Sequence, residues 1–267
     1  MNNLHRELAP ISSAAWSQIE DEVARTFRRS VAGRRVVDVK EPGGLELAAV
    51  GTGHLRAISP PQKGVDARVR EVRPIVELTV PFELSRDAID DVERGANDSD
   101  WQPAKDAATQ LAYAEDRAIF DGYKAAGIVG IREGSSNARL ALPQTVADYP
   151  AAIGNALEQL RLAGVDGPYS VLLGADAYTA LTEGRDGGYP IIEHLRNIVS
   201  GDIIWAPAIN GGSVLSTRGG DFELHLGQDL SIGYQSHTDR VVRLYLRETL
   251  TFQMLTSEAS VSLELTA

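Results

Sequence analysis

The spacing of apolar residues near the start of the chain predicts an amphipathic helix. Its apolar face is formed by five residues spaced three or four apart: Trp16, Ile19, Val23, Phe27 and Val31. Ser12 or Ser13 can cap the helix, and Gly33 is expected to end it with a left-handed backbone. Two interpretations of the apolar face remain open. Either it packs on the core of the chain itself, or part of it, especially Phe27 and Val31, stays open for a partner.

Residues 34–82 predict strands and turns. A short strand is expected at 36–39, and two extended runs follow between residues 48 and 82, joined by Ser59–Gly64. A hairpin of this length, with Pro60 and Pro61 at its tip, has few residues beside it that could form a core. Since isolated hairpins are marginally stable, we expect it to lie against another surface, for example another subunit.

Two helices are predicted between residues 84 and 127. Ser85 can cap a short helix over Arg86–Arg94, and a longer one is expected from about Pro103 to Ala126. The longer helix carries a stripe of mostly small residues: Ala107, Leu111, Ala114, Ala118, Gly122 and Ala125. Such a stripe permits close approach to a neighbouring backbone, so this helix is expected to lie flat on a sheet.

The remainder of the chain predicts a small α/β module followed by a return to β structure. Helices are expected at 150–162, 175–181 and 190–199, alternating with short strands at 170–173, 202–206 and 213–216. A strand is also expected at 222–226. Val242–Met254 is the strongest strand signal, and only Glu248 interrupts its apolar face. The chain as a whole is therefore predicted to be an α+β protein.

Composition narrows the classes of function. With 26 Lys and Arg against 37 Asp and Glu among 267 residues, the net charge is −11, which disfavours nucleic acid as a partner. Cysteine is absent, so disulfides and thiolate sites are excluded. No apolar run reaches the roughly 20 residues that a membrane span needs. Because the first ten residues also lack the apolar stretch of a secretory signal, we expect a cytoplasmic protein with no membrane partner.

The inventory of catalytic groups is thin. The five histidines are scattered without metal-binding spacing, and no nucleotide-binding glycine motif or serine nucleophile motif occurs. Asp90 and Asp91, or Asp98 and Asp100, are the only pairs that resemble an acid/base dyad, and helix capping or solvation explains them better. The residues alone therefore predict neither a metal site nor an active site, and we expect a protein that is not an enzyme.

Short segments along essentially the whole chain resemble one protein family. They are Met1–Pro10, Gly33–Val39, Ile89–Gly95, Asp98–Trp101, Glu115–Phe120, Gly164–Leu173, Gly188–Pro190, Ile203–Pro207, Ser216–Phe222, Gly227–Tyr234 and Glu248–Phe252. In this collinear series the sequence resembles the encapsulins, the shell proteins of bacterial nanocompartments, whose older members were named linocin-type bacteriocins. The amino-acid sequences of these segments are most similar to those of the actinobacterial branch of the family.

The resemblance implies the major capsid fold of the Hong Kong 97 bacteriophage type. Residues 1–48 with 77–135 and 221–267 would form a peripheral domain, 49–76 an extended loop, and 136–220 an axial domain. Smaller members of the family close as sixty copies with icosahedral symmetry. In such a particle a glycine-rich loop would ring the five-fold pore: Glu183, Gly184, Arg185, Asp186, Gly187, Gly188 and Tyr189.

The family also implies a binding site for the C-terminal targeting peptide of a cargo enzyme on the inner wall. Carried over to this sequence, the candidates are Phe27, Val31, Arg34, Asp38, Asp229, Leu230 and Ile232. Phe27, Leu230 and Ile232 would supply an apolar groove, because an extended apolar peptide needs such a surface with a few polar anchors. Arg34 and Asp38 would be those anchors. The alternative is that these two residues only form a salt bridge with each other.

The cargo that the resemblance implies is a dye-decolorizing peroxidase active in oxidative stress, or less often a ferritin-like iron-storage protein. Haem or iron would then belong to the cargo, and no cofactor is expected in the shell. Some relatives bind flavin beside an aromatic residue, but Asp87 stands at that position here, which speaks against flavin binding. A phage-derived capsid protein and a hydrolase or bacteriocin-type activity remain the alternative functions. Extracellular release without a typical signal also stays open.

Overall fold

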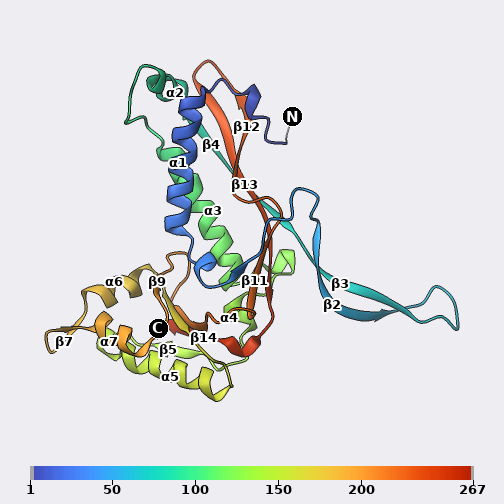
Figure 1. Cartoon of the computed structure of the whole chain (residues 1–267), viewed down its shortest axis with the longest axis vertical. Coiled ribbons are helices and arrows are strands. Elements are labelled where there is room, and N and C mark those ends of the chain that lie inside the picture. The colour runs from blue at the N-terminus through green and yellow to red at the C-terminus, as the bar shows by residue number, and fades with distance from the viewer. Residues whose placement is uncertain (1–2, 266–267) are drawn as a thin grey trace.

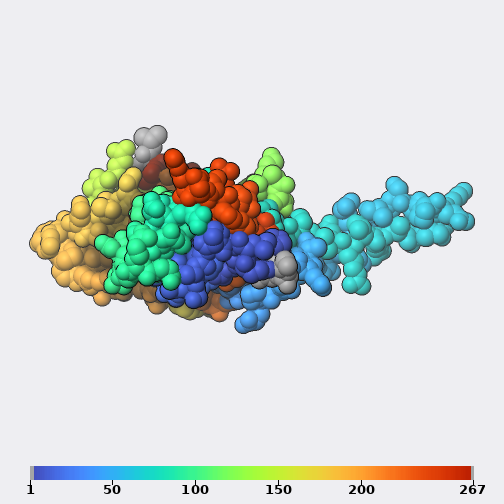
Figure 2. Space-filling model, turned by 90° about the horizontal axis from the view of Figure 1, so that it is seen from above, coloured from blue at the N-terminus to red at the C-terminus, as the bar shows by residue number. Residues whose placement is uncertain are grey.

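The computed structural model describes residues 3–265, which form a body of two lobes with a thin projecting arm (Figure 1). The first lobe combines helices with a five-stranded sheet, and the second surrounds another five-stranded sheet. The arm is a separate two-stranded hairpin that extends well clear of the body (Figure 2). The predicted α+β class is therefore confirmed.

The sheet of the first lobe is organised around its longest strand, β13. Its strands are β1 (Asp38–Val39), β4 (Val76–Ser85), β11 (Phe222–Leu226), β12 (Ser231–His237) and β13 (Val241–Met254). The order is β1-β11-β13-β12, and β4 also pairs with β13, antiparallel. Alternate residues of β13 are buried, as the sequence pattern predicts. β12 was not expected from the periodicity.

Helix α1 (Ser13–Ser30) packs along helix α3 (Gln102–Phe120), and α3 lies on strands β4 and β13. The side chain of Ser12 accepts a hydrogen bond from the N–H of Ala15, which confirms the predicted cap. The expected role of Gly33 is wrong, because α1 ends at Ser30 and Gly33 begins a 3-10 turn without a positive φ. Gly33 is needed for space instead: a Cβ there would lie 2.6 Å from Cδ1 of Ile119.

The predicted long helix ends six residues earlier than expected, at Phe120. The chain turns at Gly122, whose φ is +85°, and its backbone packs directly against Gly130. Gly122 and Ala125 therefore do not belong to the small-residue stripe of the helix. The short helix α2 (Arg86–Glu93) is capped by the side chain of Ser85, as predicted.

The second lobe contains a sheet with the strand order β5-β14-β10-β6-β9. These strands are β5 (Leu140–Leu142), β6 (Tyr169–Leu173), β9 (Ile203–Trp205), β10 (Gly212–Ser216) and β14 (Ser260–Leu265). Helices α4 (Ile131–Gly134), α5 (Tyr149–Leu162), α6 (Ala175–Glu183) and α7 (Ile191–Ile198) belong to the same lobe, and β7 (Arg185–Asp186) pairs with β8 (Tyr189–Pro190). The 3-10 turns are Arg6–Leu8, Gly33–Arg35, Lys124–Ala126, Val146–Asp148 and Ser257–Ala259.

The last strand changes the expected division of the chain. β14 lies between β5 and β10, so residues close to the carboxyl end complete the sheet of the second lobe. The expectation that all of 221–267 belongs with the first lobe is therefore wrong for β14. This strand lacks a clear sequence pattern, because Ser260–Leu263 is buried on both faces and mixes serine with apolar residues.

The arm consists of β2 (Ala49–Ile58) and β3 (Ala67–Pro74), which pair with each other and with no other strand of residues 3–265. Most of its residues are exposed, including Leu55, Val69 and Val72. This confirms the predicted hairpin and its lack of a local core. None of the helices in the described part of the chain combines the length and apolar character that crossing a bilayer needs.

Candidate functional site

A groove of about 260 Å³ lies between helix α1 and the start of strand β12. It is lined by residues of the amino-terminal segment, α1 and β12: Leu4, Arg6, Glu20, Val23, Ala24, Leu230, Ser231 and Ile232. Leu4, Val23 and Ile232 are buried and make its inner surface apolar. Arg6 and Glu20, which are partly exposed, form an ion pair of 2.5 Å beside it. The groove therefore offers an apolar surface with charged groups at its edge.

The amino-terminal wall of the groove is attached to the rest of the first lobe. The N–H of Tyr234 on β12 donates to the carbonyl of Leu4 at 2.8 Å, and the hydroxyl of Tyr245 on β13 donates to the carbonyl of Asn3 at 3.2 Å. The guanidinium of Arg6 lies over the ring of Trp16, 4.2 Å from its centroid. These contacts hold residues 3–6 against both the sheet and α1.

Two of the predicted peptide-binding residues, Leu230 and Ile232, line this groove. Phe27 and Val31 are not among the residues that line it, and both are buried in the core between α1, α3 and the sheet. The interpretation in which Phe27 and Val31 stay open for a partner is therefore wrong for the folded chain. The opposite interpretation, that this face packs on its own core, is confirmed.

Arg34 lies at the centre of a cluster of carboxylates next to the groove. Its Nε and Nη2 donate to Glu115 at 2.8 and 2.6 Å, its Nη1 donates to Asp229 at 2.8 Å, and Nη2 also contacts Glu248 at 3.3 Å. The guanidinium lies 4.9 Å from the ring centroid of Phe27. One side chain thus joins the end of α1 to α3, to β13 and to the segment before β12.

The cluster continues at Asp116, beside Glu115 on α3. Its carboxylate accepts hydrogen bonds from the N–H groups of Ala32 and Gly33 at 2.8 and 2.7 Å. Asp116, Glu115 and Glu248 are fully buried. Such burial is costly for carboxylates unless hydrogen bonds and cations compensate, and Arg34 is the cation that this cluster shares.

Burial changes the acidity of these groups. Desolvation raises the pKa of Asp116 to about 7, although the two backbone N–H groups act in the opposite direction. Desolvation, followed by the charge of Glu115, raises the pKa of Glu248 well above its ordinary value. Burial alone would lower the pKa of Arg34, but the surrounding carboxylates outweigh it and raise that pKa.

Asp38 lies apart from this cluster. Its carboxylate accepts the N–H of Gly220 at 2.6 Å and lines a separate cavity of about 190 Å³ with Arg35 and Phe222. Arg34 and Asp38 therefore neither form the salt bridge that was the alternative interpretation nor anchor one common groove. The residues predicted to bind the peptide therefore do not form one site. They lie in the groove, in the cluster around Arg34, in the core, and at the separate cavity beside Asp38.

The predicted pore loop is a compact hairpin at the far end of the second lobe (Figure 1). Gly187 and Gly188 both have positive φ, +54° and +88°, which is the signature of a tight two-residue turn. Arg185, Asp186 and Tyr189 are exposed around it. Glu183 ends α6, and Gly184 is closely packed, since a Cβ there would lie 2.9 Å from Cγ1 of Val146.

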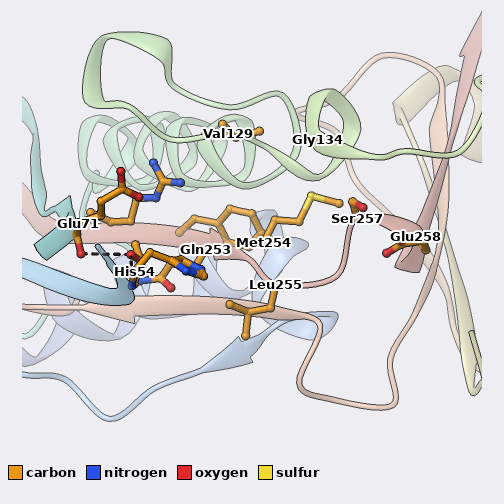
Figure 3. Close-up of a pocket in the computed structure, with 12 residues that line it drawn as sticks. His54, Glu71, Val129, Gly134, Gln253, Met254, Leu255, Ser257 and Glu258 are labelled. Carbon is orange, nitrogen blue, oxygen red and sulfur yellow. Dashed lines mark hydrogen bonds between the residues drawn. The ribbon is translucent and has the colours of Figure 1, made fainter. Parts of the chain in front are cut away.

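A larger cavity of about 530 Å³ lies where the arm leaves the body (Figure 3). Figure 3 shows His54 and Glu71 of the arm at one end, Ser257 and Glu258 at the other, and Met254 between them. Its mixed polar and apolar lining contains no arrangement of a nucleophile with a base. It is a recess between the arm and the end of β13.

One member of each acidic pair considered from the sequence has a structural role. Asp100 accepts the N–H of Gln102 at the start of α3, and Asp91 pairs with Arg94. The N–H of Asp87 donates to the Ser85 cap of α2. Within residues 3–265, no group of three or more histidine or acidic side chains is arranged to hold a metal ion.

The fold is shared with viral and virus-like shells. A virus-like particle from Pyrococcus furiosus aligns with a TM-score of 0.67 at 18% identity, over 93% of this chain and 99% of that chain. A protein of Mycobacterium phage Bobi aligns with a TM-score of 0.58 at 14% identity, over 89% of this chain and 91% of that chain. The expected Hong Kong 97-type capsid fold is confirmed, and the molecule has a capsid-like fold.

Sequence comparison assigns the family. The family model described as "Encapsulating protein for peroxidase" matches residues 1–251. The chain is 64% identical to the type 1 encapsulin shell protein of Rhodococcus erythropolis, covering 98% of this chain and all of the relative. It is 61% identical to that of Mycobacterium tuberculosis, over 98% of this chain and 99% of the relative. The chain belongs to the encapsulin shell protein family, whose role is structural.

Proposed function

We propose that copies of this chain, sixty in number, assemble into a closed icosahedral shell that encloses a cargo enzyme. The observation that carries the assembly is the arm, because β2 and β3 pair only with each other and expose apolar side chains along their length. Apolar surface of this extent on a hairpin without a core is stabilised when another surface covers it. In a closed shell, that surface is a neighbouring copy.

Cargo selection is assigned to the groove between α1 and β12. Its apolar inner surface and the Arg6–Glu20 pair suit a short extended peptide that inserts an aliphatic side chain and fixes its register with polar contacts. The groove would face the interior, where it captures the C-terminal peptide of the cargo. One such contact is weak, but a cargo oligomer that presents several peptides binds with higher avidity.

The cargo is proposed to be a dye-decolorizing peroxidase, in line with the family description, with a ferritin-like protein as the second candidate. Haem or iron would enter with that cargo. The hairpin over residues 183–189 would surround the five-fold pore through which small substrates pass. A cytoplasmic location, extracellular release and the absence of flavin stay predictions.

Mass spectrometry of the particle purified from its native host tests the cargo assignment. The proposal expects a peroxidase or ferritin-like protein at a constant ratio to the shell, with an apolar segment at its C-terminus. Particles that contain no second protein would contradict cargo packaging. Among the alternative functions, the phage-capsid interpretation loses support, because the relatives at 61% and 64% identity are encapsulin shell proteins.

A further inference from the structure

Glu115 and Glu248 are fully buried carboxyl groups that meet at the guanidinium of Arg34. The two carboxyl groups share the Nη2 of Arg34, which donates to Oε2 of Glu115 at 2.6 Å and lies 3.3 Å from Oε2 of Glu248. Oε1 of Glu248 is buried and has no hydrogen-bond partner. Two adjacent carboxylates cannot both ionise without strong repulsion, whereas a proton on Glu248 makes it a donor and removes one charge.

The other charges around the pair do not replace this proton. Arg34 supplies one positive charge and is shared with Asp229, and Asp116 adds a further carboxyl group from α3. Arg247, the neighbour of Glu248 on β13, is directed elsewhere: its Nε lies 3.4 Å from Glu77 on β4. Three fully buried carboxyl groups and the half-exposed Asp229 therefore depend on a single cation.

This cluster is connected to the groove. Asp229 binds Arg34 and also accepts the N–H of Leu230, which lines the groove. On the other side, Arg34 follows α1, which forms the opposite wall. A change in the charge of the cluster therefore affects the positions of both walls of the groove, because Arg34 contacts both.

We propose that the Glu115–Glu248 pair under Arg34 is a proton-dependent latch that holds the end of α1 and the Asp229–Leu230 segment in place. When the pair holds the proton, Arg34 stays bound to Glu115 and Asp229, and the groove keeps its shape. Without the proton, repulsion among the carboxylates favours local opening at residues 31–35 and 228–232. That the groove binds cargo rests on the proposed function, whereas the latch itself does not.

The direction of the pH effect follows from linkage. Burial raises the pKa of Glu248 above the ordinary glutamate value of about 4.3, and it raises the pKa of Asp116 to about 7, so each group adds to the protons that the closed state holds over the opened state. The latch is therefore strongest below the ordinary glutamate pKa and weakens as pH rises through the raised pKa values. Within this window, one proton changes the opening equilibrium about tenfold per pH unit.

Hydrogen exchange measured by mass spectrometry on assembled, cargo-free particles between pH 5 and 9 tests the latch. After correction for intrinsic exchange, wild-type protection at residues 31–35 and 228–232 should fall by about tenfold per pH unit across the window. Glu248→Gln, which mimics the protonated group, should reduce this slope to the part that Asp116 contributes below about pH 7. Glu77→Gln, which alters an ion-paired glutamate on β4 of the same sheet, should keep the wild-type slope.

A wild-type protection that does not change with pH would overturn the latch, and so would a Glu248→Gln particle with the wild-type slope. If Glu248→Gln does not assemble, Glu115→Gln is measured in the same way, and a slope equal to that of the wild type overturns the latch. Because the particles contain no cargo, a negative result here does not contradict the proposed cargo packaging. Equally, finding that native particles contain no cargo does not contradict the latch.

Discussion

Arg34 and Glu115 form a bidentate ion pair, in which Nε lies 2.8 Å from Oε1 and Nη2 lies 2.6 Å from Oε2. Glu115 is fully buried, and the side chain of Arg34 is 19% exposed. Removing one partner of such a pair leaves an uncompensated buried charge, which commonly costs about 3–5 kcal/mol. The pair is therefore sensitive to substitution from either side.

Arg34→Ala should destabilise the shell subunit by about 3–5 kcal/mol, because Glu115 and Glu248 lose their shared cation. Arg35→Ala is the matched control, since Arg35 is half exposed and lies 3.6 Å from the exposed Asp202. The control should change stability by less than about 1 kcal/mol. Thermal unfolding and the yield of assembled particles measure both, and equal losses for the two variants would contradict the assigned role of Arg34.

Gly33→Ala should also be destabilising, although it adds only one methyl group. The added Cβ would lie 2.6 Å from Cδ1 of Ile119 and 3.0 Å from Oδ1 of Asp116, so packed side chains must move, at a cost of about 1–3 kcal/mol. Gly154→Ala in helix α5 is the control, because its Cβ meets no atom within 4 Å. The control should be neutral or stabilising by up to about 1 kcal/mol. An unchanged free energy of unfolding in Gly33→Ala would show that the Ile119 side chain moves aside without cost, which would contradict the assigned role of Gly33.

Ala24→Leu should reduce cargo loading while leaving the shell intact. Ala24 lines the groove and is only partly buried, so a leucine occupies the space assigned to the peptide without disturbing the core. We expect at least about a tenfold lower cargo-to-shell ratio, corresponding to about 1.4 kcal/mol. Ala14→Leu, at an exposed position of the same helix, serves as the control. Unchanged loading in the Ala24 variant, measured by quantitative mass spectrometry, would place the peptide elsewhere.

Deleting Ser59–Gly64 from the tip of the arm should lower the heat stability of the particle. The tip is exposed and makes no contact that supports the fold of the single chain, so the loss should appear only in contacts between copies. Differential scanning calorimetry of particles, together with circular dichroism of dissociated subunits, separates the two effects. Particles with the wild-type transition temperature would reject the assigned role of the tip.

Much of the fold could be predicted from the sequence because the relevant signals are local. The alternation over 242–254 gave β13, the Ser85 cap gave α2, and the isolated runs around Ser59–Gly64 gave the arm. The helix end at Phe120 could not be predicted in this way, because it depends on the close packing of Gly122 against Gly130. β14 was missed because its partners lie far away in sequence.

The candidate site was harder to predict, because its parts meet only in three dimensions. Leu230 and Ile232 were identified, but Phe27 and Val31 proved to be core residues, and the sequence cannot distinguish an apolar face that packs inward from one that binds a peptide. Glu248 did give a signal, as the one acidic residue on the buried face of β13. Its partner Arg34 is more than two hundred positions away, so the charge cluster became visible only in the structure.

Electron microscopy of the purified, full-length protein tests most directly whether this chain builds a shell. We expect uniform hollow particles with icosahedral symmetry, sixty subunits, and the β2–β3 arm of each subunit lying on a neighbour. A protein that stays a single copy at micromolar concentration, or particles in which the arms make no contact between subunits, would contradict it.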